Sequence, residues 1–360
     1  MKTADYMKFL NKLFLKNNSL PIYLVLFITS RCTLNCRHCL LGQGMIKDSY
    51  EMTIDDLEKL SLSMGRLLFL LPTGGEPFLR EDITEIIQMF YKNNRVCNIG
   101  IPTNGSLTDL VIEKTEDILD TVPEVDLAID VSIDGIGDDH NYIRNNPDSF
   151  NKAVYTFREL KKLEKRHPNF NANIGLTVSA YNIDRIYDLY EYLQKDLGVR
   201  TINHLLVRGN PREDKAGNVD IDKYMKFSLF LEEEIKQGRL RGYKGFPFAN
   251  LINSIRSVRP HIIKQRLERK KQVIPCLAAR LGAVVLSDGM VMPCEILDKP
   301  IGDLKTAGFN FSRIWFSRER KEIVEFIKRD KCCCTYECFL TLSIFFSFSG
   351  LLKVFREYLS

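Results

Sequence analysis

Three cysteines lie within eight residues of one another early in the chain, at a spacing suited to binding an inorganic cluster. Cys32, Cys36 and Cys39 form a C-x3-C-x2-C arrangement. On a loop, three thiolates can bind one iron–sulfur cluster and leave its fourth iron without a protein ligand. The alternative is a closed zinc site with His38 as the fourth ligand. We favour the cluster, because three cysteines leave its fourth iron free to bind a small molecule, whereas a structural zinc ion is closed by four protein ligands.

Short apolar segments alternate with amphipathic ones through the first 207 residues. The predicted strands are Ile22–Ile28, Leu67–Leu71, Val96–Ile101, Val125–Ile133, Asn173–Val178 and Thr201–Val207. The predicted helices are Thr53–Met64, Ile83–Tyr91, Asp109–Leu119, Ser149–Lys165 and Ile183–Lys195. This alternation predicts an α/β fold whose parallel sheet closes wholly or partly into a TIM-type barrel.

In such a barrel, functional side chains follow the C-terminal ends of the strands. The cysteine loop follows the first strand, and Thr73–Pro77 follows the second. In that second segment, Gly74 and Gly75 let a ligand approach the backbone, and Glu76 can pair with an ammonium group. Polar residues also follow the third and fourth strands: Thr103, Asn104, Ser132 and Asp134. Each segment alone fits a simple turn, but together they predict a binding site on one rim.

In this order, the motifs resemble the radical S-adenosylmethionine (radical SAM) enzymes over residues 20–207. The resemblance implies a partial (β/α)6 barrel in which Cys32, Cys36 and Cys39 hold a [4Fe–4S] cluster and SAM chelates the open iron. Reductive cleavage of SAM would give a 5′-deoxyadenosyl radical that abstracts hydrogen from a substrate. The implied SAM contacts are His38 with the adenine, Gly74, Gly75 and Glu76 with the methionyl ammonium, and Thr103, Asn104, Ser132, Asp134 and Arg144 with other groups.

A second group of cysteines follows the barrel. Cys276 and Cys294 flank a predicted hairpin over residues 283–292, and a cluster of cysteines follows at Cys332, Cys333, Cys334 and Cys338. The pattern resembles the SPASM extension, or its shorter twitch version, which binds auxiliary [4Fe–4S] clusters. The cysteines are too few for the full two-cluster pattern, so we expect one auxiliary cluster. Its expected ligands are Cys276, Cys294, Cys334 and Cys338, with Cys332 as the substitute and Cys333 as a spectator. A structural zinc knuckle is the alternative.

The composition fits a globular protein, since the net charge is +5, with 27% charged and 45% hydrophobic residues. Ten cysteines without an export signal predict a cytoplasmic location and metal ligation rather than structural disulfides. Cys97 stands alone in an apolar stretch, and we expect a buried core thiol there.

Five segments are expected: an amphipathic N-terminal helix (1–19), the barrel (20–209), a basic helical connector (210–275), a smaller iron–sulfur domain (276–338) and an apolar tail (339–360). Residues 235–271 hold eleven basic residues and one acidic residue. They either attract an anionic substrate or lipid or form a solvated helical face. The apolar terminal segments fit either peripheral membrane contact or docking on the barrel. Nothing indicates nucleic-acid binding.

The sequence therefore predicts a radical SAM oxidoreductase supplied with electrons by a donor such as flavodoxin or ferredoxin. The leading interpretation of its substrate is a peptide or protein being matured. The alternatives are a cell-envelope or lipid-linked precursor and a cofactor precursor. A non-catalytic iron–sulfur electron carrier is the other class, and Glu76 argues against it because a carrier needs no carboxylate that binds ammonium. No catalytic side chain beyond the cofactor ligands is predicted.

Overall fold

The computed structural model describes residues 7–9, 11–12, 19–46, 50–242, 249–329, 332 and 334–359. Most of the predicted N-terminal helix (1–19) lies outside the described residues, as does Cys333. The described strands form one nine-stranded sheet in the order β6-β5-β4-β3-β2-β1-β7-β8-β9. They are β1 (Tyr23–Thr29), β2 (Phe69–Gly74), β3 (Asn98–Thr103), β4 (Asp126–Ser132), β5 (Phe170–Val178), β6 (Ile202–Leu206), β7 (Gly282–Val285), β8 (Met290–Met292) and β9 (Gly302–Asp303).

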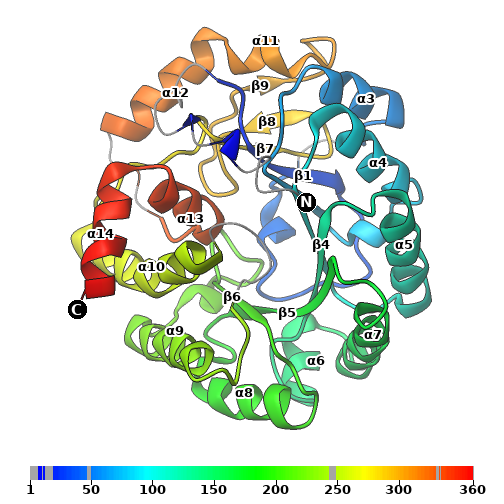
Figure 1. The fold of residues 1–360 in the computed structure, drawn as a ribbon, viewed down its shortest axis with the longest axis vertical. Coiled ribbons are helices and arrows are strands. Elements are labelled where there is room, and N and C mark those ends of the chain that lie inside the picture. The colour runs from blue at the N-terminus through cyan, green and yellow to red at the C-terminus, as the bar shows by residue number, and fades with distance from the viewer. Residues whose placement is uncertain are drawn as a thin grey trace.

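The first six strands pair in parallel in chain order, with helices outside them (Figure 1). These helices are α3 (Ile54–Leu62), α4 (Ile83–Asn94), α5 (Thr108–Thr121), α6 (Asp138–Arg144), α7 (Ser149–Glu164) and α8 (Ile186–Lys195). Short 3₁₀ helices are η1 (Leu40–Gln43), η2 (Pro77–Leu79), η3 (Ile183–Arg185) and η4 (Asp214–Gly217). All six predicted strands are present, and the predicted partial barrel is confirmed.

Burial on both faces explains the continuous apolar run of β1. Its residues from Leu24 to Ile28 are each at most 3% exposed, and β1 is an interior strand that pairs with β2 on one side and β7 on the other. Parallel strands covered on both faces require such runs. Cys97 is also buried, at 1% exposure, so its predicted core position is confirmed.

The barrel stays open at β6, where helices replace a further strand. They are α9 (Ile221–Lys236), α10 (Ala249–Arg269) and α13 (Glu337–Phe345). Oε1 of Glu337 accepts hydrogen bonds from the backbone N–H of Leu206 at 2.8 Å and from the hydroxyl of Tyr224 at 2.9 Å. Nη2 of Arg256 donates to the carbonyl of Ile202 at 3.3 Å. Side chains thus satisfy polar groups that an open sheet edge would expose.

The C-terminal region continues the barrel sheet instead of forming a separate one. Strand β7 pairs in parallel with β1, and Tyr23 lies opposite Gly282. The predicted hairpin over residues 283–292 is confirmed, because β7 and β8 pair antiparallel; β9 then extends the pairing. This arrangement fixes the segments around Cys276 and Cys294 against the barrel.

Four further helices complete the C-terminal region: α11 (Phe311–Trp315), α12 (Arg318–Arg329), α13 and α14 (Phe348–Leu359). Most apolar side chains of α13 are buried, whereas α14 exposes Phe348, Leu352 and Phe355. No single helix within the described ranges is long and apolar enough to cross a membrane. The bent pair Glu337–Phe345 and Phe348–Phe355, at 88°, passes the length and composition test only when both are taken together.

Candidate functional site

Two glycines allow the end of β2 to pack directly on the cysteine loop. The N–H of Gly75 donates to the carbonyl of Thr29 at 3.0 Å, and that of Glu76 to the carbonyl of Arg31 at 2.8 Å. A Cβ at Gly75 would lie 2.0 Å from the Arg31 oxygen. Gly74 has φ +139°, and its Cβ would lie 2.0 Å from the Thr29 oxygen. Only glycine permits this approach.

Replacing Gly75 with alanine is therefore expected to displace the cysteine loop. The free energy of unfolding should fall by about 1–3 kcal/mol, the usual range for overpacking. Iron retained after anaerobic reconstitution should fall as well. The control is Gly217→Ala, since a Cβ at Gly217 meets no atom within 4 Å. Unchanged iron content in the Gly75→Ala protein would show that the loop tolerates the added methyl group.

The other side of the cysteine loop is anchored by a segment about 175 residues later. The N–H of Arg212 donates to the carbonyl of Cys39 at 3.0 Å, and the N–H of Glu213 to that of Arg37 at 2.8 Å. Nε of Arg212 also donates to the carbonyl of Cys36 at 3.2 Å. Glu213 in addition forms an ion pair with Arg37. No motif marks these anchors in the sequence.

The thiols of the loop receive hydrogen bonds from several directions. Nδ2 of Asn104 lies 3.7 Å from Sγ of Cys32, and Nη1 of Arg144 lies 3.8 Å from Sγ of Cys36. Burial raises the pKa of Cys36 to about 11, while Arg144 opposes that rise and the charges of Cys39 and Cys32 add to it. The charges of Cys39 and Cys32 act on Cys36, which places the three thiols near one another, although no group of three described side chains is already arranged to bind a metal ion. Donors to sulfur suit the ligands of an anionic cluster.

Glu76 lies beside this space and gathers two other predicted residues. Its Oε1 accepts from the hydroxyl of Thr103 at 2.9 Å, and its Oε2 accepts from the N–H of Asn104 at 2.8 Å. Burial raises the pKa of Glu76 to about 7, and these hydrogen bonds oppose the rise. No cationic side chain forms an ion pair with this carboxylate within the described part of the chain. A positively charged ligand group would supply that partner.

Asp134 and Arg144 pair with each other at the end of β4. Nε of Arg144 donates to Oδ2 of Asp134 at 2.7 Å, and the N–H of Thr177 donates to Oδ1 at 2.8 Å. Nε2 of His38 lies 3.8 Å from the same Oδ2. The pair thus links the cysteine loop to β4 and β5. The predicted Ser132 ends β4 and is half-buried.

His38 keeps one polar atom without a partner. Its side chain is buried, and Nδ1 forms no hydrogen bond. Burial lowers the pKa of His38 to about 4, although Asp134 opposes the shift, so the imidazole is neutral near pH 7. An orphaned ring nitrogen beside the cysteine loop is suited to a ligand with its own hydrogen-bonding edge.

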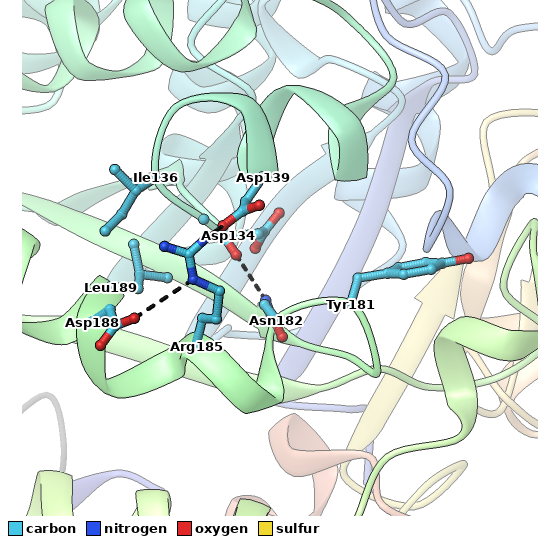
Figure 2. A pocket seen from close by; sticks show the side chains of 9 residues that line it. Asp134, Ile136, Asp139, Tyr181, Asn182, Arg185, Asp188 and Leu189 are labelled. Carbon is cyan, nitrogen blue, oxygen red and sulfur yellow. Dashed lines mark hydrogen bonds and ion pairs between the residues drawn. The ribbon is translucent and has the colours of Figure 1, made fainter.

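Asp134 also borders a small pocket between the ends of β4 and β5 (Figure 2). Nδ2 of Asn182 donates to its carbonyl at 2.9 Å. In the same view, Arg185 forms ion pairs with Asp139 and with Asp188, the latter at 3.6 Å. The ion pairs of Arg185 neutralise charge within this pocket, and Asn182 links the pocket to the backbone of Asp134.

A second cavity collects cysteines of the C-terminal region. It is lined by Cys276, Cys294, Cys332 and Cys334. Three of the four expected ligands, together with the predicted substitute Cys332, therefore surround one space. Burial raises the pKa of Cys276, with Cys334 adding to the rise, and burial also raises that of Cys294.

Cys338, the remaining expected ligand, lies outside the lining of this cavity. It stands in the first turn of α13, where burial raises its pKa to about 11 and nearby Arg208 opposes the rise. Nε of Arg208 donates to Oε2 of Glu295 at 2.8 Å. Cys334 thus lines the cavity and Cys338 does not, although only three residues lie between them in sequence.

Comparison with known proteins identifies both cysteine regions. Residues 26–193 match the model of the Radical SAM superfamily, and residues 276–339 match that of SPASM, an iron–sulfur cluster-binding domain. The antilisterial bacteriocin subtilosin biosynthesis protein AlbA of Bacillus subtilis is 23% identical over 285 residues, which cover 78% of this chain and 56% of AlbA. GTP 3′,8-cyclase of Alkaliphilus oremlandii is 27% identical over 187 residues, which cover 50% of this chain and 55% of the cyclase. The chain thus spans little more than half the length of these relatives.

Among solved structures, Streptococcus suis SuiB bound to precursor peptide SuiA has a TM-score of 0.61 and 13% identity, covering 90% of this chain and 70% of SuiB. This likeness supports the fold. The loop thiols, two of which have donors at their sulfurs, and the orphaned Nδ1 of His38 fit a [4Fe–4S] cluster with SAM, and the second cysteine cavity fits an auxiliary cluster. The chain therefore belongs to the radical SAM superfamily and carries a C-terminal SPASM domain.

Proposed function

We propose that this radical SAM enzyme matures a peptide or protein substrate. SuiB, which shares the fold, was solved with a precursor peptide, and AlbA is named for the biosynthesis of a bacteriocin. The observation that carries the enzymatic assignment is that the loop with three thiols also holds the neutral ring of His38 and lies beside the buried carboxylate of Glu76. An electron carrier needs thiols but has no use for the other two groups.

The residues of the chain divide the work at this site. When bound, the [4Fe–4S] cluster and SAM supply reductive cleavage of the sulfonium and hydrogen abstraction. Cys32, Cys36 and Cys39 would hold the cluster. Arg144 and Asn104 orient the sulfur atoms by hydrogen bonding. Glu76 would bind the methionyl ammonium, with Gly74 and Gly75 giving access to the backbone, and His38 would face the adenine.

The proposal is tested by incubating anaerobically reconstituted protein with SAM and dithionite. We expect 5′-deoxyadenosine to form with dithionite. We also expect it to form when dithionite is replaced by flavodoxin or ferredoxin, the proposed physiological electron donors. Absence of the product from protein that holds its iron would contradict the assignment. Deuterium transfer from a labelled candidate peptide into 5′-deoxyadenosine would then establish the substrate class.

A cofactor precursor is the second candidate, favoured by the match to GTP 3′,8-cyclase. Such anionic substrates would need unpaired basic side chains. Several basic residues of the 235–271 segment are instead paired: Arg239 with Glu234, Arg256 with Glu232, and Lys264 with Asp222. This pairing weakens the attraction that the sequence suggested, so we rank the peptide first. The same argument applies to a lipid-linked precursor.

Glu76→Gln is expected to lower the affinity for SAM about tenfold or more, because a hydrogen bond to a charged group contributes about 1.5–3 kcal/mol. Titration calorimetry on cluster-loaded enzyme at pH 8 measures the loss, since there the carboxylate with a pKa of about 7 is ionised. Stability should change less than affinity, because glutamine retains one acceptor oxygen.

The matched control is Glu337→Gln. Glu337 is also fully buried and also accepts from one backbone N–H and one hydroxyl, but it lies at the β6 edge. The Glu337→Gln protein should have a lower free energy of unfolding than the wild type but the same affinity for SAM. Equal affinities in wild type and Glu76→Gln would remove Glu76 from the SAM contacts.

We also propose peripheral contact with an anionic membrane. Phe348, Leu352 and Phe355 of α14 are each about 60% exposed and fall on one helical face. Nζ of Lys353 on α14 lies 3.4 Å from Oε1 of Gln265 on the neighbouring α10. The exposed Arg269, Lys270 and Lys271 follow at the end of α10. An apolar face beside basic residues is typical of interfacial binding.

Leu352→Glu is expected to reduce co-sedimentation with phosphatidylglycerol vesicles at least several-fold, because it places a carboxylate in the apolar face. Leu62→Glu is the control, since Leu62 is 67% exposed on the distant helix α3. Equal sedimentation of wild type, Leu352→Glu and Leu62→Glu would contradict the membrane contact.

A further inference from the structure

Two residues that line the cavity of Cys276, Cys294, Cys332 and Cys334 each keep a buried polar atom that has no hydrogen-bond partner. The two atoms are Nε of Arg266 and the hydroxyl oxygen of Tyr336. Both side chains are only 2% exposed. Buried polar groups are normally paired, so an orphaned donor in a cavity indicates a ligand that the polypeptide does not supply.

Arg266 is held rigidly in this position. It comes from α10, and its Nη1 donates to the carbonyl of Cys334 at 3.2 Å. Its Nη2 donates to the carbonyl of Ile274 at 3.2 Å. Two of the three guanidinium nitrogens are thus fixed by backbone flanking the cysteines. The third nitrogen, Nε, has no partner in the protein and remains available to a ligand of the cavity that Arg266 lines.

The charge of Arg266 also lacks an ion-pair partner here. The residues that line the cavity are cysteines, apolar residues, Tyr336, Ser343 and Arg266 itself, with no aspartate or glutamate among the described residues. Burying a guanidinium without a counter-charge is strongly unfavourable. An iron–sulfur cluster held by thiolates is an anion and would supply both the missing charge and acceptor sulfur atoms.

We infer that Arg266 donates a hydrogen bond from Nε to the auxiliary cluster and raises its reduction potential. The inference rests on the auxiliary cluster assigned to this cavity. The reduced cluster carries more negative charge than the oxidised one, so a fixed cation and a hydrogen bond to sulfur favour reduction. Arg266 is therefore a positioning and tuning residue that determines how readily the auxiliary cluster accepts an electron.

The test uses the full-length chain with Cys32, Cys36 and Cys39 replaced by alanine, so that only the auxiliary cluster is observed. After anaerobic reconstitution, a redox titration followed by electron paramagnetic resonance gives its midpoint potential. Arg266→Gln should reduce the ratio of reduced to oxidised cluster at least tenfold at a fixed potential, which corresponds to about 59 mV for one electron. Arg266→Lys keeps the charge and should shift the potential less.

Arg320→Gln is the matched control. Arg320 is also a buried arginine of the C-terminal region, and its Nη1 donates to the carbonyl of Ala279 at 3.0 Å, but it does not line the cavity. If Arg320→Gln shifted the midpoint potential as much as Arg266→Gln, the effect would come from a general loss of packing in the C-terminal region, and the inference would be overturned. No shift in Arg266→Gln at unchanged iron content would overturn it as well.

A second measurement needs no substitution of Arg266. Protein grown with ¹⁵N-labelled arginine should show a nitrogen hyperfine coupling to the reduced cluster, and its absence would overturn the inference even if Arg266→Gln loses iron. The radical SAM chemistry is tested by a separate measurement, the formation of 5′-deoxyadenosine by the wild-type protein. A chain that makes this product but shows no arginine coupling would keep its proposed function and lose this assignment.

Discussion

Cys36→Ala is expected to abolish SAM cleavage while leaving the barrel folded. Cys36 is only 8% exposed, and its sulfur accepts a hydrogen bond from Nη1 of Arg144 at 3.8 Å. Removing the sulfur takes one of three ligands from the cluster, whereas the backbone of the loop keeps its bonds to Arg212 and Glu213. The free energy of unfolding should therefore fall by only about 1 kcal/mol. Iron content, circular dichroism and 5′-deoxyadenosine formation measure the three effects.

The matched control is Cys97→Ala. Cys97 is buried at 1% exposure in a separate apolar cluster with Ile22 and Leu281, away from the cysteine loop. This substitution should cost a similar amount of stability but leave SAM cleavage intact. Normal cleavage by Cys36→Ala would remove the cluster assignment from the loop.

The parts of the fold predicted correctly are those that depend on local sequence. Strand β1 is a continuous apolar run because both of its faces are buried. Strands β4 and β6 instead alternate buried and half-buried residues. The loop of Cys32, Cys36 and Cys39 was recognised because its three ligands are close in sequence. Likewise, Gly74 and Gly75 stand where the backbone of β2 touches that of the loop.

Contacts between residues far apart in the chain leave no recognisable pattern in the local sequence. The anchors Arg212 and Glu213 bind the loop through backbone groups, which any residue type provides. Glu337 covers the β6 edge from a helix that begins 131 residues after Leu206. Arg266 lies in a segment rich in basic residues, a pattern typical of a solvated helical face. The packing of α10 nevertheless buries the Arg266 side chain.

The pairing of Asp134 with Arg144 shows the same limit at the site itself. Each was expected to contact SAM separately. Helix α6 brings Arg144 back over the end of β4, so the two charges neutralise each other and Arg144 reaches Sγ of Cys36. The pair therefore acts on the cluster loop as one unit, and substitution of either residue leaves a buried charge without its partner.

Iron content distinguishes an auxiliary iron–sulfur cluster from a zinc site in the second cysteine cavity. With one auxiliary [4Fe–4S] cluster, the reconstituted wild-type protein should hold about eight irons and eight sulfides per chain. The variant lacking Cys32, Cys36 and Cys39 should retain about four of each, because the cavity lies in another part of the fold. A zinc knuckle would instead leave this variant colourless, with about one zinc and no sulfide.

The same variant decides which cysteine is the fourth ligand of the auxiliary cluster. Cys276, Cys294 and Cys334 belong to both the sequence-based set and the cavity lining, so the choice lies between Cys332 and Cys338. Because Cys332 lines the cavity and Cys338 stands beside Arg208, we expect Cys332→Ala to lose most of the remaining iron and Cys338→Ala to keep it. The reverse result would mean that α13 shifts when the cluster binds, since its first turn must then bring Cys338 into the cavity. A wild-type content of about twelve irons would indicate a third cluster and contradict both assignments.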